Sequence, residues 1–138
     1  MQQAHTILRK RTPGRGFMDL TPEIARWVRS TGLQTGLLTV FCRHTSASLL
    51  IQENADPTVR RDFETVWSRL APDGRHYAHE TEGPDDMAAH IRTALTQTSL
   101  SVPVLDGRPV LGTWQAIYLW EHRAAPHERE IVLHLLGD

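Results

Sequence analysis

The stretch LLTVFCRHTSASLLIQENAD, residues 37–56, decides how the rest of the chain is organised. It contains two apolar segments, separated by the polar residues 43–46 and closed by a polar end at 52–56. The first segment is rich in β-branched and aromatic residues, which favours a strand over a helix, and its two faces are both apolar enough to be covered. The second segment alternates apolar and polar residues, which is typical of a strand with one solvent-exposed face. The pattern predicts two short strands joined at residues 43–46, which together form a central hairpin.

The two ends of the second strand carry polar residues that are candidates for a site. His44 precedes the strand and Glu53 ends it. If the two strands pair antiparallel, these residues are separated by roughly 25 to 30 Å of chain at about 3.3 Å per residue. A single site that uses both residues therefore needs a bend or a second subunit.

The composition predicts a single soluble domain that spans residues 1–138. Hydrophobic residues make up 40% of the chain and charged residues 22%, which is enough for one core. The formal net charge of −1 argues against bulk electrostatic capture of nucleic acid. The sequence has no apolar run of membrane-spanning length and no signal-peptide pattern, so we expect no membrane partner.

The chain has one cysteine, Cys42, so it cannot form an internal disulfide. Together with the missing signal peptide, this predicts a reducing, cytoplasmic setting. A reactive thiol beside His44 is one reading of Cys42, but we favour a buried structural thiol, because residues two apart on a strand share a face without being in contact.

Three segments have the capping residues and apolar spacing of helices. The first begins at Thr21–Glu23, where a capping hydroxyl precedes a proline and an acid, and it ends at Gly32. The third begins at Asp85, after a polar loop at residues 75–84. The second begins at Asp56 and carries an apolar stripe that we expect to lie in the core: Val59, Phe63, Val66, Trp67 and Leu70.

Strand patterns fill both ends of the chain, at residues 3–11, 100–105, 114–121 and 130–136. Asp106-Gly107 is a strong hairpin signal after the second of these strands. Helices interspersed among strands with short turns predict an α+β fold with a mostly antiparallel sheet and about three helices.

Three of the eight histidines lie on three different predicted elements: His44 at a strand end, His79 in a polar loop and His90 on a helix. Three imidazoles with carboxylates nearby form the ligand set of an open divalent-metal site, most often zinc. Asp86, one helical turn before His90, or Glu80 would orient a ligating ring. The spacing matches no local metal motif, so histidines that cap, bond within the fold or lie on the surface are the alternative.

A second polar constellation is GTWQ, residues 112–115. A glycine followed by a hydroxyl, an indole and an amide suits a platform that stacks on a ring and bonds to it. The alternative is an ordinary strand start with a half-buried tryptophan.

Taken together, these motifs resemble one family. The segments are GLLTVFCRHTSASLLIQENADPTVRRD (36–62), HETEGPDDMAAHI (79–91) and DGRPVLGTWQAIYLWEHR (106–123). They resemble the YjbQ family, whose members are described as secondary thiamine-phosphate synthases. The resemblance extends from about Leu8 to Gly137.

This resemblance implies a compact α+β fold dominated by an antiparallel, sandwich-like sheet, and a homotrimer. It also implies weak thiamine-phosphate synthase activity, in which a hydroxymethylpyrimidine diphosphate is joined to a thiazole phosphate with release of pyrophosphate. A small phosphorylated substrate is therefore the expected partner.

The family motifs fall on defined residues of this chain: HTSAS on 44–48, ENxDP on 53–57, GxDDxxxHI on 83–91 and GTWQ on 112–115. The resemblance strengthens the prediction of a divalent-metal site, with zinc as the expected ion, at His44, His79 and His90. Glu53 and Asp86 become the candidate catalytic acids. The candidate substrate-binding residues are Arg43, Thr45, Ser46, Ser48, Asn54, Trp114, Gln115 and Arg129.

Two other functions remain open. A metal-dependent hydrolase would use the same three histidines, with Glu53 or Asp86 as general base. A non-enzymatic, ligand-binding trimer would use the histidines for structure. In the trimer that the resemblance implies, Glu53 and residues 112–115 would reach the histidine cluster of a neighbouring subunit.

Overall fold

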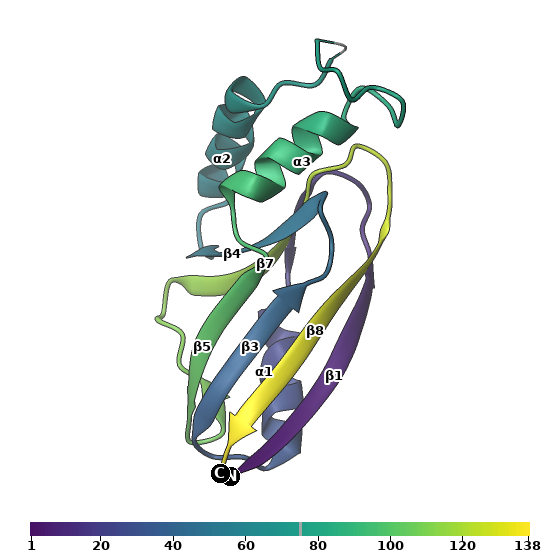
Figure 1. The fold of residues 1–138 in the computed structure, drawn as a ribbon. Helices are drawn as coiled ribbons and strands as arrows, with labels where there is room; N and C mark the ends of the chain where they lie inside the picture. The colour runs from purple at the N-terminus through teal and green to yellow at the C-terminus, as the bar shows by residue number, and fades with distance from the viewer. Residues whose placement is uncertain (75) are drawn as a thin grey trace.

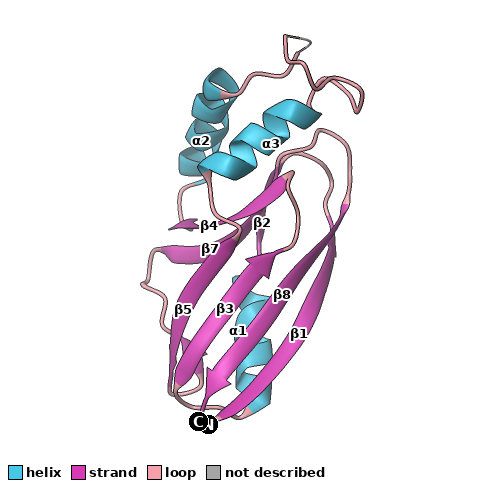
Figure 2. Ribbon diagram, viewed as in Figure 1, coloured by secondary structure: helices cyan, strands magenta, loops and turns pink. Residues whose placement is uncertain are grey.

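The computed structural model describes residues 1–74 and 76–138, and it has an α+β fold (Figures 1 and 2). Arg75, the first residue of the predicted loop, lies outside the described residues. Among the described residues, no helix has both the length and the apolar character needed to cross a membrane. The elements in chain order are β1 (Gln2–Arg11), β2 (Gly16–Asp19), α1 (Thr21–Thr31), β3 (Gly36–Cys42), β4 (Ala47–Glu53), α2 (Pro57–Leu70), α3 (Asp86–Leu95), β5 (Ser99–Leu105), β6 (Arg108–Pro109), β7 (Gln115–Glu121) and β8 (Glu128–Gly137).

Within the described residues the strands form two antiparallel sheets. The larger has the order β1-β8-β3-β5-β6 and the smaller β2-β7-β4. Figure 1 shows α1 behind the larger sheet, both termini at one end of it, and α2 and α3 at the opposite end. The predicted α+β fold with a mostly antiparallel sheet is confirmed.

The predicted pairing of the two central strands is wrong. β3 lies between β8 and β5, whereas β4 pairs with β7 in the other sheet. Residues 43–46 therefore form a corner between the sheets instead of a hairpin turn. The Ser46 carbonyl accepts a hydrogen bond from the His122 amide at 3.2 Å, which extends the β4–β7 pairing into the corner. Apolar periodicity predicts strands but not their partners, so the sequence did not reveal this corner.

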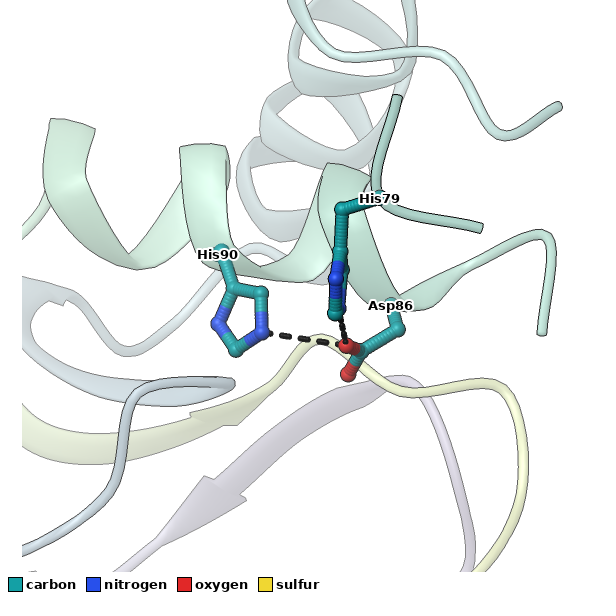
Figure 3. A group of neighbouring side chains, drawn as sticks. All are labelled: His79, Asp86 and His90. Carbon is teal, nitrogen blue, oxygen red and sulfur yellow. Dashed lines mark hydrogen bonds and ion pairs between the residues drawn. The ribbon is translucent and has the colours of Figure 1, made fainter. Parts of the chain in front are cut away.

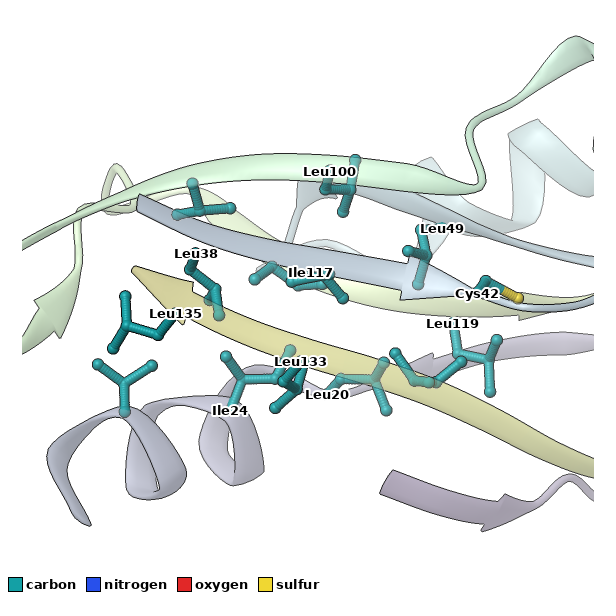
Figure 4. Packing of buried hydrophobic residues seen from close by; sticks show 14 of the residues in the cluster. Leu20, Ile24, Leu38, Cys42, Leu49, Leu100, Ile117, Leu119, Leu133 and Leu135 are labelled. Atoms are coloured by element: carbon teal, nitrogen blue, oxygen red, sulfur yellow. The ribbon is translucent and has the colours of Figure 1, made fainter. Parts of the chain in front are cut away.

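The core lies between the two sheets and α1 (Figure 4). Alternate residues of β3 point into it, whereas Leu37 and Phe41 on the other face are 47% and 42% exposed. Our expectation that both faces of this strand are covered is therefore wrong. Buried side chains from the sheets and the helix include Leu20, Ile24, Leu38, Leu49, Leu100, Ile117, Leu119, Leu133 and Leu135.

Cys42 belongs to this core and is 1% exposed. Burial raises the pKa of its thiol to about 11, although the charge of Arg129 opposes the shift. Its Sγ donates to the Ala47 carbonyl at 3.5 Å. The prediction of a buried thiol is confirmed, and at neutral pH this thiol is protonated and poorly nucleophilic.

The helix starts follow the predicted capping only in part. Asp56 caps α2, because its Oδ1 accepts from the Thr58 amide at 2.9 Å. Thr21 does not cap α1: the N-cap residue is Leu20, and the Thr21 hydroxyl accepts from the Ile117 amide of β7 at 2.8 Å. The Thr21 hydroxyl therefore makes a tertiary hydrogen bond to β7, instead of capping the helix as the local pattern had predicted. As predicted, α1 ends at Gly32, and this glycine adopts the left-handed conformation.

The prediction that the apolar stripe of α2 lies in the core is wrong. Along residues 57–70, all of which are described, no side chain is buried, and Val66 and Leu70 are 44% and 60% exposed. Trp67 contacts Trp120 of β7, with ring centroids 5.4 Å apart. The helix lies beyond the end of the larger sheet instead of across its face (Figure 1), so the core cannot cover the whole stripe.

Candidate metal centre

Three side chains meet near the start of α3: His79, Asp86 and His90 (Figure 3). The Asp86 Oδ2 atom lies 2.7 Å from His79 Nε2 and 3.0 Å from His90 Nε2. One ligand atom from each residue lies within 4.8 Å of the others. A single carboxylate oxygen therefore faces two ring nitrogens.

The local sequence explains how these residues come together. Asp86 and His90 are four residues apart on α3, so they lie on the same side of the helix one turn apart. His79 comes from the loop that leads into this helix and reaches back over its first turn (Figure 3). The cluster is thus built from a short segment, 79–90, and long-range contacts from Arg123 and Thr45 hold it in place.

Asp86 is the anchor of the cluster because it is 2% exposed. Its Oδ1 atom pairs with Arg123 Nη1 at 2.9 Å. Burial alone raises the pKa of the Asp86 carboxyl, but its contacts with His79, His90 and Arg123 outweigh burial and hold the pKa below its usual value. The carboxylate is therefore charged at neutral pH.

The long-range contact orients His90. Its Nδ1 lies 2.8 Å from the Thr45 carbonyl in the 43–46 corner. A carbonyl oxygen can only accept, so Nδ1 carries the proton, and in the neutral ring the Nε2 lone pair points at Asp86 Oδ2. Two acceptors 3.0 Å apart require a positive species to hold them together, either a proton or a metal ion.

The donor set fits a divalent metal ion. Two imidazole nitrogens and one carboxylate oxygen are the ligands of open catalytic zinc sites, with one position left for water or substrate. The bond from His90 Nδ1 to a backbone carbonyl is the usual support for a ligating histidine. His79 is 42% exposed on its side chain, so the cluster is accessible from solvent.

The structure brings together two of the three predicted metal ligands. His44 lies outside the group, and its Nε2 accepts a hydrogen bond from the Glu130 amide at 2.7 Å. The role of His44 as a ligand stays a prediction. It would require that Nδ1 bind the metal, or that Nε2 give up its hydrogen bond with the Glu130 amide. Asp86 touches both rings directly, whereas Glu80 is exposed in the loop.

A cavity of about 580 Å³ lies beside the cluster and is lined by His90. This volume is within the range of small-molecule sites. Arg43, His44 and Thr45 line it from the corner, and Thr93 lines it from α3. Two predicted substrate-binding residues, Arg43 and Thr45, thus lie at a cavity next to the candidate metal ligands.

Three other predicted substrate-binding residues are buried inside the fold, which does not support contact with a substrate. The Arg129 guanidinium bonds to the Glu121 carboxylate and to Ser46. The Ser48 hydroxyl lies 2.8 Å from His122 Nε2. These polar residues flank strands in the sequence and look exposed, but partners far away in the chain satisfy them.

Glu53 and the GTWQ segment form a separate cluster at the other end of β4. The Glu53 carboxylate accepts from the amides of Ala55 and Asp56 at 3.0 to 3.1 Å and closes the turn before α2. Asn54 donates to the Thr113 carbonyl at 3.2 Å, while Trp114 is 64% exposed. The length of β4, roughly 20 Å, separates this turn from the 43–46 corner.

Sequence reasoning missed Arg123, Glu121 and the buried state of His122. Arg123 also bonds to Asp85 Oδ2 at 2.9 Å, so it clamps both acids at the start of α3. The only sequence signal was the run Glu-His-Arg at the end of a strand, which by itself resembles a solvated strand end.

Because His122 is buried, we expect the stability of the protein to depend measurably on pH. It is fully buried, and burial together with the charges of Arg92, Arg15 and Arg129 lowers its pKa from 6.5 to about 3. Between these values the unfolded chain binds a proton that the folded protein excludes, so stability is highest above pH 6.5 and falls as the pH drops. We expect a loss of about 2 kcal/mol between pH 7 and pH 5 from this residue.

Urea unfolding at both pH values of the parent and of the His122→Asn variant checks this expectation. The carboxylates give both proteins a common pH dependence, so the difference between the two slopes isolates the histidine. Equal slopes would contradict a buried, neutral His122.

Comparisons with known proteins agree with this structure. The model of the family described as UPF0047 protein YjbQ-like matches residues 5–138. A UPF0047 protein of Synechocystis is 51% identical over 138 residues, which cover 99% of this chain and 94% of that protein. The chain belongs to the YjbQ family. The UPF0047 protein YjbQ of Escherichia coli is 45% identical over 125 residues, 90% of this chain and 91% of that protein.

A solved YjbQ structure has the same fold. An uncharacterized conserved protein of the YjbQ/UPF0047 family from Clostridium acetobutylicum superposes with a TM-score of 0.83 at 32% identity, covering 96% of this chain and 99% of that one. The names of these YjbQ relatives specify the family and no reaction.

Proposed function

We propose that the chain is a metal-dependent transferase for small phosphorylated substrates, of the secondary thiamine-phosphate synthase type. The observation that carries the proposal is the Asp86 oxygen that faces both His79 Nε2 and His90 Nε2. The cavity beside His90 supplies a place for a substrate next to this cluster. Zinc is the ion that this donor set suits best.

In the proposed reaction, the carbon–oxygen bond between the pyrimidine methylene and the diphosphate breaks, and the diphosphate takes the electron pair. The thiazole nitrogen then forms the new bond to that carbon. A divalent ion held by His79, Asp86 and His90 would supply charge stabilisation for the departing diphosphate. Arg43, which is 55% exposed on its side chain at the cavity, would add positive charge.

A hydrolase is the second candidate, and one observation favours it. Within one chain, Trp114 and Gln115 lie at the end of β4 opposite the 43–46 corner, and neither is among the described residues that line the cavity. Water would then be the acceptor in place of the thiazole nitrogen.

One experiment separates the two reactions. Zinc-loaded protein is given hydroxymethylpyrimidine diphosphate with and without thiazole phosphate, and both thiamine phosphate and pyrophosphate are measured. Thiamine phosphate formed in step with pyrophosphate supports the transferase. Equal pyrophosphate release without thiazole phosphate supports the hydrolase, and no release in either mixture contradicts both.

We also propose that the chain assembles as a homotrimer and that the apolar face of α2 contributes to its interface. The exposed side chains of Val66 and Leu70 are costly in water, and a groove of about 250 Å³ between Val59 and Trp67 continues this face. Assembly would also bring the Trp114 platform toward a neighbour's cavity.

The double substitution Val66→Glu with Leu70→Glu is expected to convert the trimer to monomer, because two charges on the helix face oppose burial. Size-exclusion chromatography with light scattering measures the change. Leu105→Glu, at a residue 51% exposed near the β5–β6 turn, is the control and should leave the trimer intact. A monomeric parent, or a trimeric double variant, would contradict the proposed interface.

A further inference from the structure

The 43–46 corner is fixed to β8 on both sides of Thr45. Before Thr45, the His44 Nε2 accepts from the Glu130 amide at 2.7 Å. After it, Arg129 Nη2 donates to the carbonyl and the hydroxyl of Ser46 at 3.2 and 3.0 Å. The residue between these contacts supplies the carbonyl that orients His90.

The contact on the Ser46 side depends on a buried ion pair. Arg129 and Glu121 are 5% and 1% exposed, and Arg129 bonds to both oxygens of the carboxylate at 2.8 and 2.5 Å. Only one terminal nitrogen, Nη2, bonds to both Glu121 and Ser46, so the carboxylate fixes where the guanidinium meets the corner.

We propose that Arg129 and Glu121 are positioning residues for the candidate metal centre, which act through the Thr45 carbonyl on the ring of His90. The inference rests on the proposed metal-dependent function for its relevance to activity. The Thr45 carbonyl lies 2.8 Å from His90 Nδ1, and it determines both the direction of the ring and which nitrogen carries the proton. If the corner moves, the His90 ring can rotate, and its Nε2 lone pair no longer points toward Asp86 Oδ2.

The small net contribution of the buried ion pair to stability indicates that it has another role. A buried pair adds little net stability over two apolar residues of similar size, because both ions lose their hydration. It does give a directional contact to a turn that has few apolar side chains of its own. Fixing the corner is therefore the property that an apolar pair cannot replace.

The test is the double variant Glu121→Met with Arg129→Met, which removes both charges and leaves neither unpaired. We expect it to fold with a melting temperature close to that of the parent. We expect its dissociation constant for zinc to rise about tenfold, the scale seen when the support of a ligating histidine is lost. Chelator competition measures the constant.

Thr12→Val is the matched control. Thr12 is 2% exposed and donates to Oε1 of the same Glu121 carboxylate, whereas the Arg129 Nη2 that meets Ser46 bonds to Oε2. This variant should lower the melting temperature and leave the zinc constant unchanged. A folded double variant with the zinc constant of the parent would overturn the proposal. If the double variant does not fold, Arg129→Lys keeps the ion pair and shortens the reach to Ser46, and it is subject to the same comparison.

A second readout does not need metal. Nitrogen-15 shifts of the His90 ring in metal-free protein report which nitrogen is protonated. In the parent the Nδ1 proton should be present in every form of the ring, whereas the double variant should also show a form protonated on Nε2 alone, and identical spectra would also overturn the proposal. A parent that binds no zinc contradicts the proposed function, while the ring shifts still decide the positioning role.

Discussion

The substitution Asp86→Asn is expected to weaken zinc binding by about 100-fold or more. The Asp86 Oδ2 atom is the only ligand atom that faces both His79 and His90 among the described residues. An amide removes the negative charge that offsets the cation, and its NH₂ group cannot accept or ligate. Elemental analysis of protein purified without a histidine tag, followed by chelator competition, measures the loss.

Asp85→Asn is the matched control for this experiment. Asp85 is the neighbouring residue and bonds to the same Arg123, but its carboxylate also accepts from the Ala124 amide and is absent from the group of three ligand atoms among the described residues. The control should keep zinc within a few-fold of the parent. Parental zinc affinity in Asp86→Asn would remove Asp86 from the centre and, with it, the proposed mechanism. The transferase and hydrolase activities should fall in parallel with metal content.

The substitution Arg123→Met is expected to cost about 3 kcal/mol of stability in the metal-free protein. Arg123 pairs with Asp85 and Asp86, and the Asp86 carboxylate is 2% exposed. Removing the guanidinium leaves the buried Asp86 carboxylate without the partner of its Oδ1 atom, and it also removes the bond to the Glu82 carbonyl at 2.9 Å. Urea denaturation followed by tryptophan fluorescence measures the change.

An exposed ion pair provides the comparison for Arg123. Arg11 and Glu128 are paired at 2.9 Å, but their side chains are 66% and 68% exposed. Solvent screens such a pair, so Arg11→Met should change stability by little more than the error of the measurement. Equal effects of the two substitutions would show that the clamp on Asp85 and Asp86 contributes no more than a surface contact.

These predictions concern contacts that the chain makes over long distances. Arg123 follows Asp86 by 37 positions, and Thr45 precedes His90 by 45. The segment that provides all three ligand atoms is nevertheless only residues 79–90. A short segment therefore supplies the donors, and the rest of the fold holds them in a defined geometry.

The sequence by itself was sufficient for those features that depend on neighbouring residues. The strand at residues 36–42, the cap at Asp56 and the end of α1 at Gly32 follow from the local backbone and its nearest side chains. The hairpin between β5 and β6 is of the same kind, because Asp106 and Gly107 both adopt the positive φ angles that their types tolerate. The i, i+4 spacing of Asp86 and His90 likewise placed two members of the cluster on one helix face.

Only the tertiary structure decided how these elements are used. It turned the expected hairpin at residues 43–46 into a corner between two sheets, left the stripe of α2 exposed and placed Asp86 in contact with both histidines. It also buried Arg129, which the sequence had suggested for substrate binding. The physical reason is that periodicity and capping record what a residue prefers next to its neighbours. Strand partners, burial and charge pairing depend on groups that the fold brings together from distant parts of the chain.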